Sequence, residues 1–156
     1  MSDTTNDHPG VVVFPPLLFV ICAVGGLIAH VVCSYRLPLA PWVPWAGGAL
    51  GLTAGLLALW GQRTMTAGGT NIRPSLPALA IVAGGPFAFT RNPLYLALIL
   101  LFTGIGVALR SPAFLVFLAP LALVLHFGVV LREERYLEAK FGVVYAGYKT
   151  RVRRWI

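Results

Sequence analysis

The sequence predicts an all-α, polytopic membrane protein with four transmembrane helices and a cytosolic helical extension at its C-terminus. The chain has 156 residues, of which 58% are apolar and only 11% are charged, and its mean hydropathy is +0.81. Soluble domains are roughly 45–50% apolar and about 25% charged, so a soluble protein of this composition would have too little polar surface to cover its core. The abundance of apolar residues also excludes a disordered chain. The length predicts one domain over residues 1–156.

Four apolar stretches predict the spans, at about residues 14–35, 42–62, 94–109 and 112–131. A bilayer core about 30 Å thick needs ~20 helical residues, with a working range of about 17–25. The first, second and fourth stretches reach that length. The third is shorter, but Pro93 suits the first position of a helix. A tight turn at residues 110–112 would join it to the fourth stretch as a hairpin.

The distribution of Lys and Arg predicts the orientation. With four spans, the N-terminus, the second connection and the C-terminal tail share one side and hold ten basic residues, whereas the other side holds Arg36 and Arg110. Basic connections stay in the cytoplasm, so both termini are expected there, at the inner membrane if the protein is bacterial. The net charge of +7 is attributed to topology and to anionic lipid headgroups, not to nucleic acid, because the basic residues flank apolar spans. The polar, acidic start of the chain lacks the basic region of a cleavable secretory signal.

Several residues predict how the helices pack. Gly47, Gly51 and Gly55 recur every four residues, which allows a neighbouring helix to approach closely. Pro120 lies inside the fourth span and predicts a bend there. Cys22 and Cys33 would be ~16 Å apart on one helix, too far to form a disulfide with each other.

The polar residues of the chain gather in two places on the same predicted side of the membrane. One is the second connection, residues 63–93, which is long enough to indicate a functional loop. The other is the end of the fourth helix, which is expected to run on to about Phe141, with Gly142 as its C-cap. The adjacent Glu133 and Glu134 then lie at the interface. A solvated helix end is the alternative interpretation of that segment. His30 and His126 are polar residues within apolar spans, which favours a functional role, and a core or interface position is the alternative interpretation for both. No set of Cys and His residues has the spacing of metal ligands, so no metal is expected.

The motifs in these two places form an ordered pattern. It reads Gly85-Pro86-Phe87, then Arg91-Asn92-Pro93-x-Tyr95, then Glu133-Glu134-x-x-Leu137-x-x-x-Phe141-Gly142-x-x-Tyr145-x-x-Tyr148-x-x-Arg151-Val152. This pattern resembles the isoprenylcysteine carboxyl methyltransferase family, whose relatives include the phospholipid N-methyltransferases. The resemblance covers the chain from about Gly69 to the C-terminus, and the first two spans match in hydropathy only.

The resemblance implies a membrane-embedded methyltransferase that uses S-adenosylmethionine and releases S-adenosylhomocysteine. It implies that the cofactor binds on the cytosolic side, between the loop motif, the start of the next helix and the double-Glu segment with its tail. It also implies a lipophilic acceptor that enters laterally from the bilayer. The family commonly has His where this chain has Asn92, and because an amide does not titrate, Asn92 cannot be a general base.

The residue types suit this cofactor. Arg91 can hold a carboxylate in a bidentate contact, and the two Glu side chains offer negative charge to hydroxyl or ammonium groups. Phe87, Tyr95, Tyr145 and Tyr148 are candidates to close over adenine. The expected catalytic residues are Arg91 and Glu134, with Glu134 as the base for a thiol or amine acceptor. The expected cofactor-binding residues are Gly85, Pro86, Phe87, Asn92, Tyr95, Glu133, Glu134, Tyr145, Tyr148 and Arg151.

Two questions stay open from the sequence. The basic tail is either an anchor to anionic lipid, with Trp155 in the interfacial belt, or a segment that folds back so that Tyr148 and Arg151 complete the pocket. The function is either methyl transfer to a lipophilic acceptor of the isoprenylcysteine type, methyl transfer to a phospholipid amine of the phosphatidylethanolamine type, or a non-enzymatic adaptor role. A carboxylate, an amine and a thiol all remain possible as the methyl acceptor.

Overall fold

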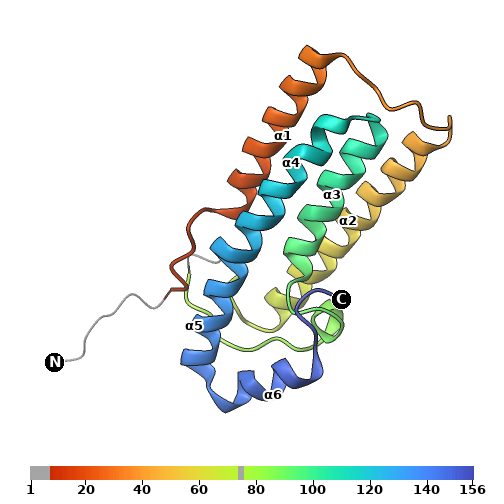
Figure 1. Cartoon of the computed structure of the whole chain (residues 1–156). Helices are drawn as coiled ribbons and strands as arrows, with labels where there is room; N and C mark the ends of the chain where they lie inside the picture. The colour runs from red at the N-terminus through yellow and green to blue at the C-terminus, as the bar shows by residue number, and fades with distance from the viewer. Residues whose placement is uncertain (1–7, 74–75) are drawn as a thin grey trace.

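The computed structural model describes residues 8–73 and 76–156, and the regular structure in this part of the chain is helical. The long helices lie lengthwise beside one another in an elongated bundle, and the last helix is turned across the lower end of this bundle (Figure 1). The elements are α1 (Pro15–Cys33), α2 (Val43–Ala67), the short 3₁₀ helix η1 (Gly85–Ala88), α3 (Pro93–Ala108), α4 (Pro112–Leu123), the π-helical segment η2 (Val124–Val130), α5 (Leu131–Phe141) and α6 (Val143–Arg151).

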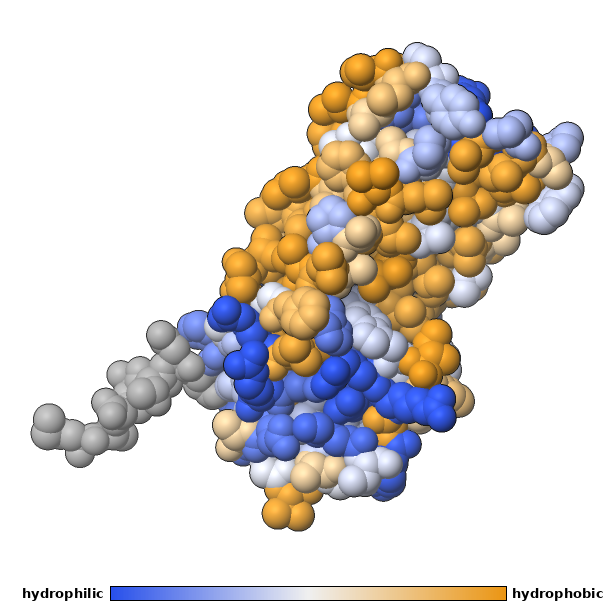
Figure 2. Space-filling view, viewed as in Figure 1, coloured by the Kyte–Doolittle hydropathy of each residue, from blue (hydrophilic) through white to orange (hydrophobic). Residues whose placement is uncertain are grey.

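Three of these helices are long and apolar enough to cross a membrane. They are Pro15–Cys33, Val43–Ala67 and the continuous helix Pro112–Phe141 formed by α4, η2 and α5. The fourth, α3, is also apolar but has only 16 residues. Large apolar side chains are exposed along the outer faces of the helices, as on α1, where Val32 is 76% exposed. Apolar surface covers the bundle and hydrophilic residues gather at its lower end (Figure 2). This division of the surface is that of an integral membrane protein.

Close backbone contact joins α2 to α3, as the glycine spacing predicts. A Cβ on Gly47 would lie 2.4 Å from the amide nitrogen of Ala108, and a Cβ on Gly104 would lie 2.8 Å from the carbonyl oxygen of Gly47. Real Cβ atoms do not approach backbone so closely, so both positions require glycine. The predicted face does not extend through all three glycines of α2. A Cβ on Gly51 would be in ordinary contact with Leu101, and a Cβ on Gly55 would meet no atom within 4 Å.

The last long helix carries Glu133 and Glu134 out of the apolar region. It continues to Phe141, where the expected cap is confirmed: Gly142 has a positive φ of 49° and its N–H donates to the carbonyl of Glu138. Proline has no N–H for the helical ladder, and the π-helical segment follows Pro120 within one turn. Inserted π turns are frequent at functional sites, and this one lies directly before the double-Glu segment.

The bundle core lies between α1, α3 and the last long helix. Its buried apolar residues are Cys22, Phe102, Phe114, Leu121, Leu125 and Val129. Phe102 contacts two rings, with centroids 5.8 Å from Phe19 and 5.0 Å from Phe114. Cys22 and Cys33 are both free, as their spacing predicts.

Substitution of Gly47 or Gly104 by Ala should destabilise the protein, because the added methyl group would have to push α2 and α3 apart. Overpacking of this kind costs typically about 1–3 kcal/mol. We expect a lower thermal unfolding midpoint in detergent for Gly47→Ala and Gly104→Ala. Gly48→Ala is the matched control, because its Cβ would meet no atom within 4 Å. Equal midpoints for all three variants would contradict the close contact of α2 with α3.

Candidate cofactor site

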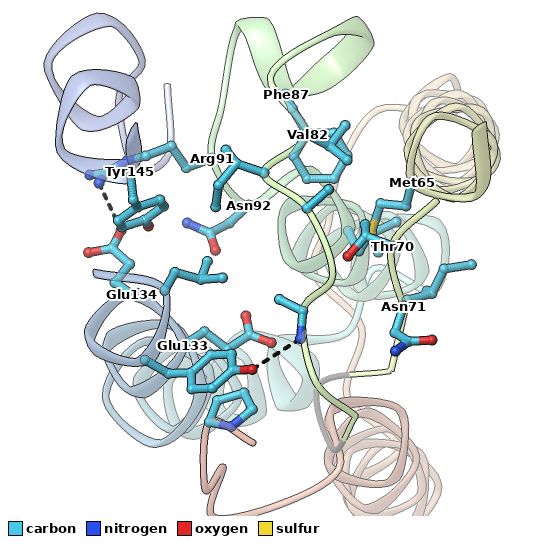
Figure 3. Close-up of a pocket in the computed structure, with 18 of the residues that line it drawn as sticks. Met65, Thr70, Asn71, Val82, Phe87, Arg91, Asn92, Glu133, Glu134 and Tyr145 are labelled. Carbon is cyan, nitrogen blue, oxygen red and sulfur yellow. Dashed lines mark hydrogen bonds and ion pairs between the residues drawn. The ribbon is translucent and has the colours of Figure 1, made fainter. Parts of the chain in front are cut away.

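A cavity of about 130 Å³ lies at the polar end of the bundle, between the α2–α3 connection on one side and α5 and α6 on the other. Figure 3 shows its residues around a common hollow, with Arg91 and Asn92 across from Glu133 and Glu134. The structure brings most of the expected site residues together here. The lining includes Phe87, Arg91, Asn92, Tyr95, Glu133, Glu134, Tyr145 and Tyr148.

The glycine and proline of the first motif shape the loop and do not line the cavity. Gly85 has a positive φ of 57°, and a Cβ there would lie 2.6 Å from the hydroxyl of Thr64. Pro86 is buried at the start of η1. This tight turn sets the position of Phe87 and directs the chain into residues 90–92, after which Pro93 begins α3 as expected.

A buried carboxylate shared by two guanidinium groups is the central polar feature of the site. The Nη1 atom of Arg91 lies 3.3 Å from Oε1 of Glu134, and these two side chains are only 10% and 7% exposed. Arg154 makes a bidentate contact with the same carboxylate, at 3.0 Å from Nε to Oε1 and 2.7 Å from Nη2 to Oε2. With two positive groups and one negative group, this cluster has a formal charge of +1.

The Arg91 guanidinium keeps hydrogen-bonding capacity. Its Nε and Nη1 atoms are buried and make no hydrogen bond among the described residues, although Nη1 lies at ion-pair distance from Glu134. Buried polar groups are nearly always hydrogen-bonded, and an orphan donor indicates a missing partner. A bound anion beside Arg91 would satisfy these donors and balance the charge of the cluster.

Glu133 faces the same cavity from the neighbouring position on α5. The Tyr95 hydroxyl donates to its Oε1 over 2.8 Å, which joins the first turn of α3 to α5. Tyr136 makes a second link, since its hydroxyl accepts from the backbone N–H of Ala78 over 3.1 Å. These contacts hold the long α2–α3 connection against α5.

The tyrosines of α6 close the cavity from below. The Tyr148 hydroxyl donates to the carbonyl of Phe87 over 2.7 Å. Burial raises the pKa of Tyr148 to about 12, although Arg91 opposes this shift. Burial also raises the pKa of Tyr145, with a further contribution from the negative charge of Glu134. Both hydroxyls are therefore protonated at neutral pH, and that of Tyr148 acts as a hydrogen-bond donor.

The tail folds back onto the site, but through a different arginine from the one expected. Arg151 is exposed, its Nε donates to the carbonyl of Gly147, and it does not line the cavity. Arg154 instead reaches Glu134, and that hydrogen bond raises the pKa of Arg154 further. The sequence signal for this residue was the dense basic tail, which does not distinguish one arginine from another.

The site residues that the sequence did not single out come mainly from the long connection. Thr70, Asn71, Arg73 and Val82 line the cavity, as do Met65 at the end of α2 and Tyr136 on α5. Among the described residues, no group of three or more His, Cys, Asp or Glu side chains is placed to hold a metal ion.

An apolar helical bundle that carries a charged cavity at one end defines an integral membrane protein with a polar site beside the bilayer. A comparison with family models gives the particular family: the phospholipid methyltransferase model matches residues 42–143, which is most of the chain. The chain belongs to this family and is a membrane methyltransferase. The match includes the loop motif and both Glu residues, and it ends before Tyr145 and the C-terminal tail. No curated protein matches the chain.

Removal of the shared carboxylate should destabilise the fold, because Arg91 and Arg154 would then face each other without compensation. Loss of one partner of a buried ion pair costs about 3–5 kcal/mol, so Glu134→Ala should clearly lower the thermal unfolding midpoint in detergent. Glu138→Ala is the control, since its contact with Lys149 is at the surface, where a pair contributes about 0–1 kcal/mol. A Glu134→Ala variant as stable as the control would show that the cluster is not a buried ion pair.

Proposed function

We propose that this protein transfers a methyl group from S-adenosylmethionine to a lipophilic acceptor at the membrane interface. The observation that carries the proposal is the convergence of the loop motif and the double-Glu segment on one cavity, where Arg91 has buried donors that make no hydrogen bond among the described residues. Family membership supports the reaction class, and the chemistry of the lining supports this cofactor.

The cavity offers a partner for each part of the cofactor. The free donors of Arg91 suit the methionine carboxylate, since guanidinium binds carboxylate in a planar, charge-assisted contact. Glu133, whose carboxylate is held by Tyr95, would attract the amine or the positive sulfur. Phe87 and Tyr145 provide aromatic surface for adenine. This set of donors, acceptors and rings fits a ligand that is both zwitterionic and cationic.

The cofactor supplies an activated methyl group, and the protein provides alignment and exclusion of water. A displacement at carbon requires acceptor, methyl group and sulfur in line, and correct orientation can contribute about 7–11 kcal/mol. A cavity closed by α6 strengthens the charge contacts inside it. Glu134, our expected base, is held by two guanidinium groups. A proton on Glu134 would remove the negative charge that holds these contacts, so the geometry favours an electrostatic role for Glu134 over proton transfer.

A second cavity supports lateral entry of the acceptor. It has a volume of about 320 Å³, lies between the start of α1 and the facing sides of α2 and α3, and is mostly apolar. It shares Ile72, Arg73, Leu94 and Tyr95 with the cofactor cavity. We propose that the hydrocarbon chain of the acceptor lies here and that its reactive group reaches the cofactor past Tyr95.

We also propose four membrane spans, with both termini and the cofactor cavity in the cytoplasm. The proposal rests on the ten basic residues expected on that side and on α3, which packs along the longer α2 and turns sharply into α4 through Arg110, at a φ of 53°. The 16 residues of α3 would span about 24 Å at 1.5 Å each, so α3 would need a slightly thinned bilayer or a short polar cap at one end.

Cofactor binding tests the proposal most simply. We expect calorimetry on the purified protein in detergent to detect S-adenosylhomocysteine binding that Arg91→Ala weakens at least tenfold, because a charge-assisted hydrogen bond is worth about 1.5–3 kcal/mol. Arg135→Ala is the matched control, since Arg135 lies on the exposed side of α5 and does not line the cavity. Folded wild-type protein that binds no cofactor would refute the proposal.

The acceptor class is tested with a radiolabelled methyl donor and three acceptor types: a prenylated cysteine with a free carboxylate, phosphatidylethanolamine, and a small hydrophobic thiol. Our first expectation is the prenylated cysteine, and the family match favours phosphatidylethanolamine as the alternative. Gly55→Leu should raise the KM for the acceptor and leave cofactor affinity unchanged, because Gly55 lines the second cavity. Gly48→Leu on the same helix is the control. Equal effects of the two variants would argue against the second cavity as the acceptor site.

A further inference from the structure

The last residues of the chain form an ordered segment, Val152–Trp155, that we call the C-terminal strap. It leaves α6 in extended conformation at Val152, which is buried. Thr90 and Arg153 then form a parallel β-bridge, in which the N–H of Arg91 donates to the carbonyl of Arg153 over 3.0 Å. The strap therefore binds the backbone of the loop motif directly, and it lies outside the residues that the family model matches.

Arg154 connects the two halves of the site. Its carbonyl accepts from the Thr90 hydroxyl over 3.2 Å and from Nδ2 of Asn92 over 3.0 Å. Its guanidinium forms the bidentate contact with Glu134 on α5. One residue thus holds the loop motif through its backbone and α5 through its side chain. Asn92 of the loop motif thus serves as a donor to the strap.

The strap is also fixed beyond Arg154. The indole N–H of Trp155 donates to Nδ1 of His126 over 3.3 Å, and the two rings stack with centroids 6.1 Å apart. His126 lies in the π-helical segment. The strap therefore contacts three separate elements, namely the loop motif, α5 and η2.

We infer that Arg154 is a positioning residue, which occupies both oxygens of Glu134 so that Arg91 keeps free donors for the carboxylate of the cofactor. This inference rests on the proposed function. A carboxylate has about four acceptor sites, and the bidentate contact of Arg154 takes one on each oxygen. Without Arg154, Arg91 would be the sole partner of a buried carboxylate and would turn fully onto it, so its donors would be used inside the protein.

The test compares two ligands in calorimetry on the full-length protein in detergent: S-adenosylmethionine and its decarboxylated analogue. Arg154→Ala should weaken binding of S-adenosylmethionine about tenfold or more and should leave binding of the decarboxylated analogue within about twofold of wild type. Arg154→Lys should also lose affinity for S-adenosylmethionine, because lysine cannot form the bidentate fork. Lys149→Ala removes a basic residue of the tail away from the cavity and should bind both ligands like wild type.

Three outcomes would overturn this inference while the proposed function still holds. Unchanged affinity for S-adenosylmethionine in a folded Arg154→Ala or Arg154→Lys variant would show that Arg154 does not position Arg91. Equal weakening of both ligands would show a general structural role of the strap. Equal losses in Arg154→Ala and Lys149→Ala would indicate that the tail acts through its overall charge. If wild-type protein binds neither ligand, the proposed function fails first, and the inference fails with it.

Discussion

The site depends on one buried carboxylate that three distant segments of the chain share. Glu134 on α5 faces Arg91 from the loop before α3 and Arg154 from the C-terminal strap. A buried charge is tolerated only when it is paired. Separating these segments would leave buried charges unpaired, which is unfavourable, so the segments stay together. The same pairing leaves one positive charge in excess and leaves Nε and Nη1 of Arg91 without hydrogen-bond partners among the described residues. The contact that stabilises the site therefore also makes it receptive to an anionic group.

The helical bundle places this cluster at the boundary between apolar and polar surface. Gly47 and Gly104 let α2 and α3 pack backbone to backbone near the end of α3. At the start of α3, after the loop motif, Gly61 of α2 lies against Leu94. The long helix from Pro112 continues past its π-helical segment and brings Glu133 and Glu134 to the same level. A charged cavity and an apolar cavity then meet at Tyr95. This arrangement suits a reaction between a polar cofactor and an acceptor that stays in the bilayer.

The sequence was sufficient for the helices and for many of the residues that line the cavity. Apolar stretches and proline positions predict the helices closely, because membrane spans have a strong and simple signal, and the ordered motifs predict that Arg91 and Glu134 converge. The choice between Arg151 and Arg154 could not be made in advance, because the tail after α6 is extended and has no periodicity from which to infer side-chain direction. The roles of Gly85 and Asn92 likewise depend on contacts with Thr64 and Arg154, residues that no local pattern connects with them. The second cavity lies between helices, and no sequence motif marks the residues that line it.

The central claim is that Arg91, aligned by the carboxylate it shares with Arg154, receives the negative end of the cofactor. An experimental structure of the full-length protein with S-adenosylhomocysteine tests it most directly. The account predicts the methionine carboxylate within hydrogen-bonding distance of Nε or Nη1 of Arg91, with the contact between Arg154 and Glu134 intact. A ligand bound elsewhere, or one bound in this cavity with its carboxylate turned away from Arg91, would contradict it.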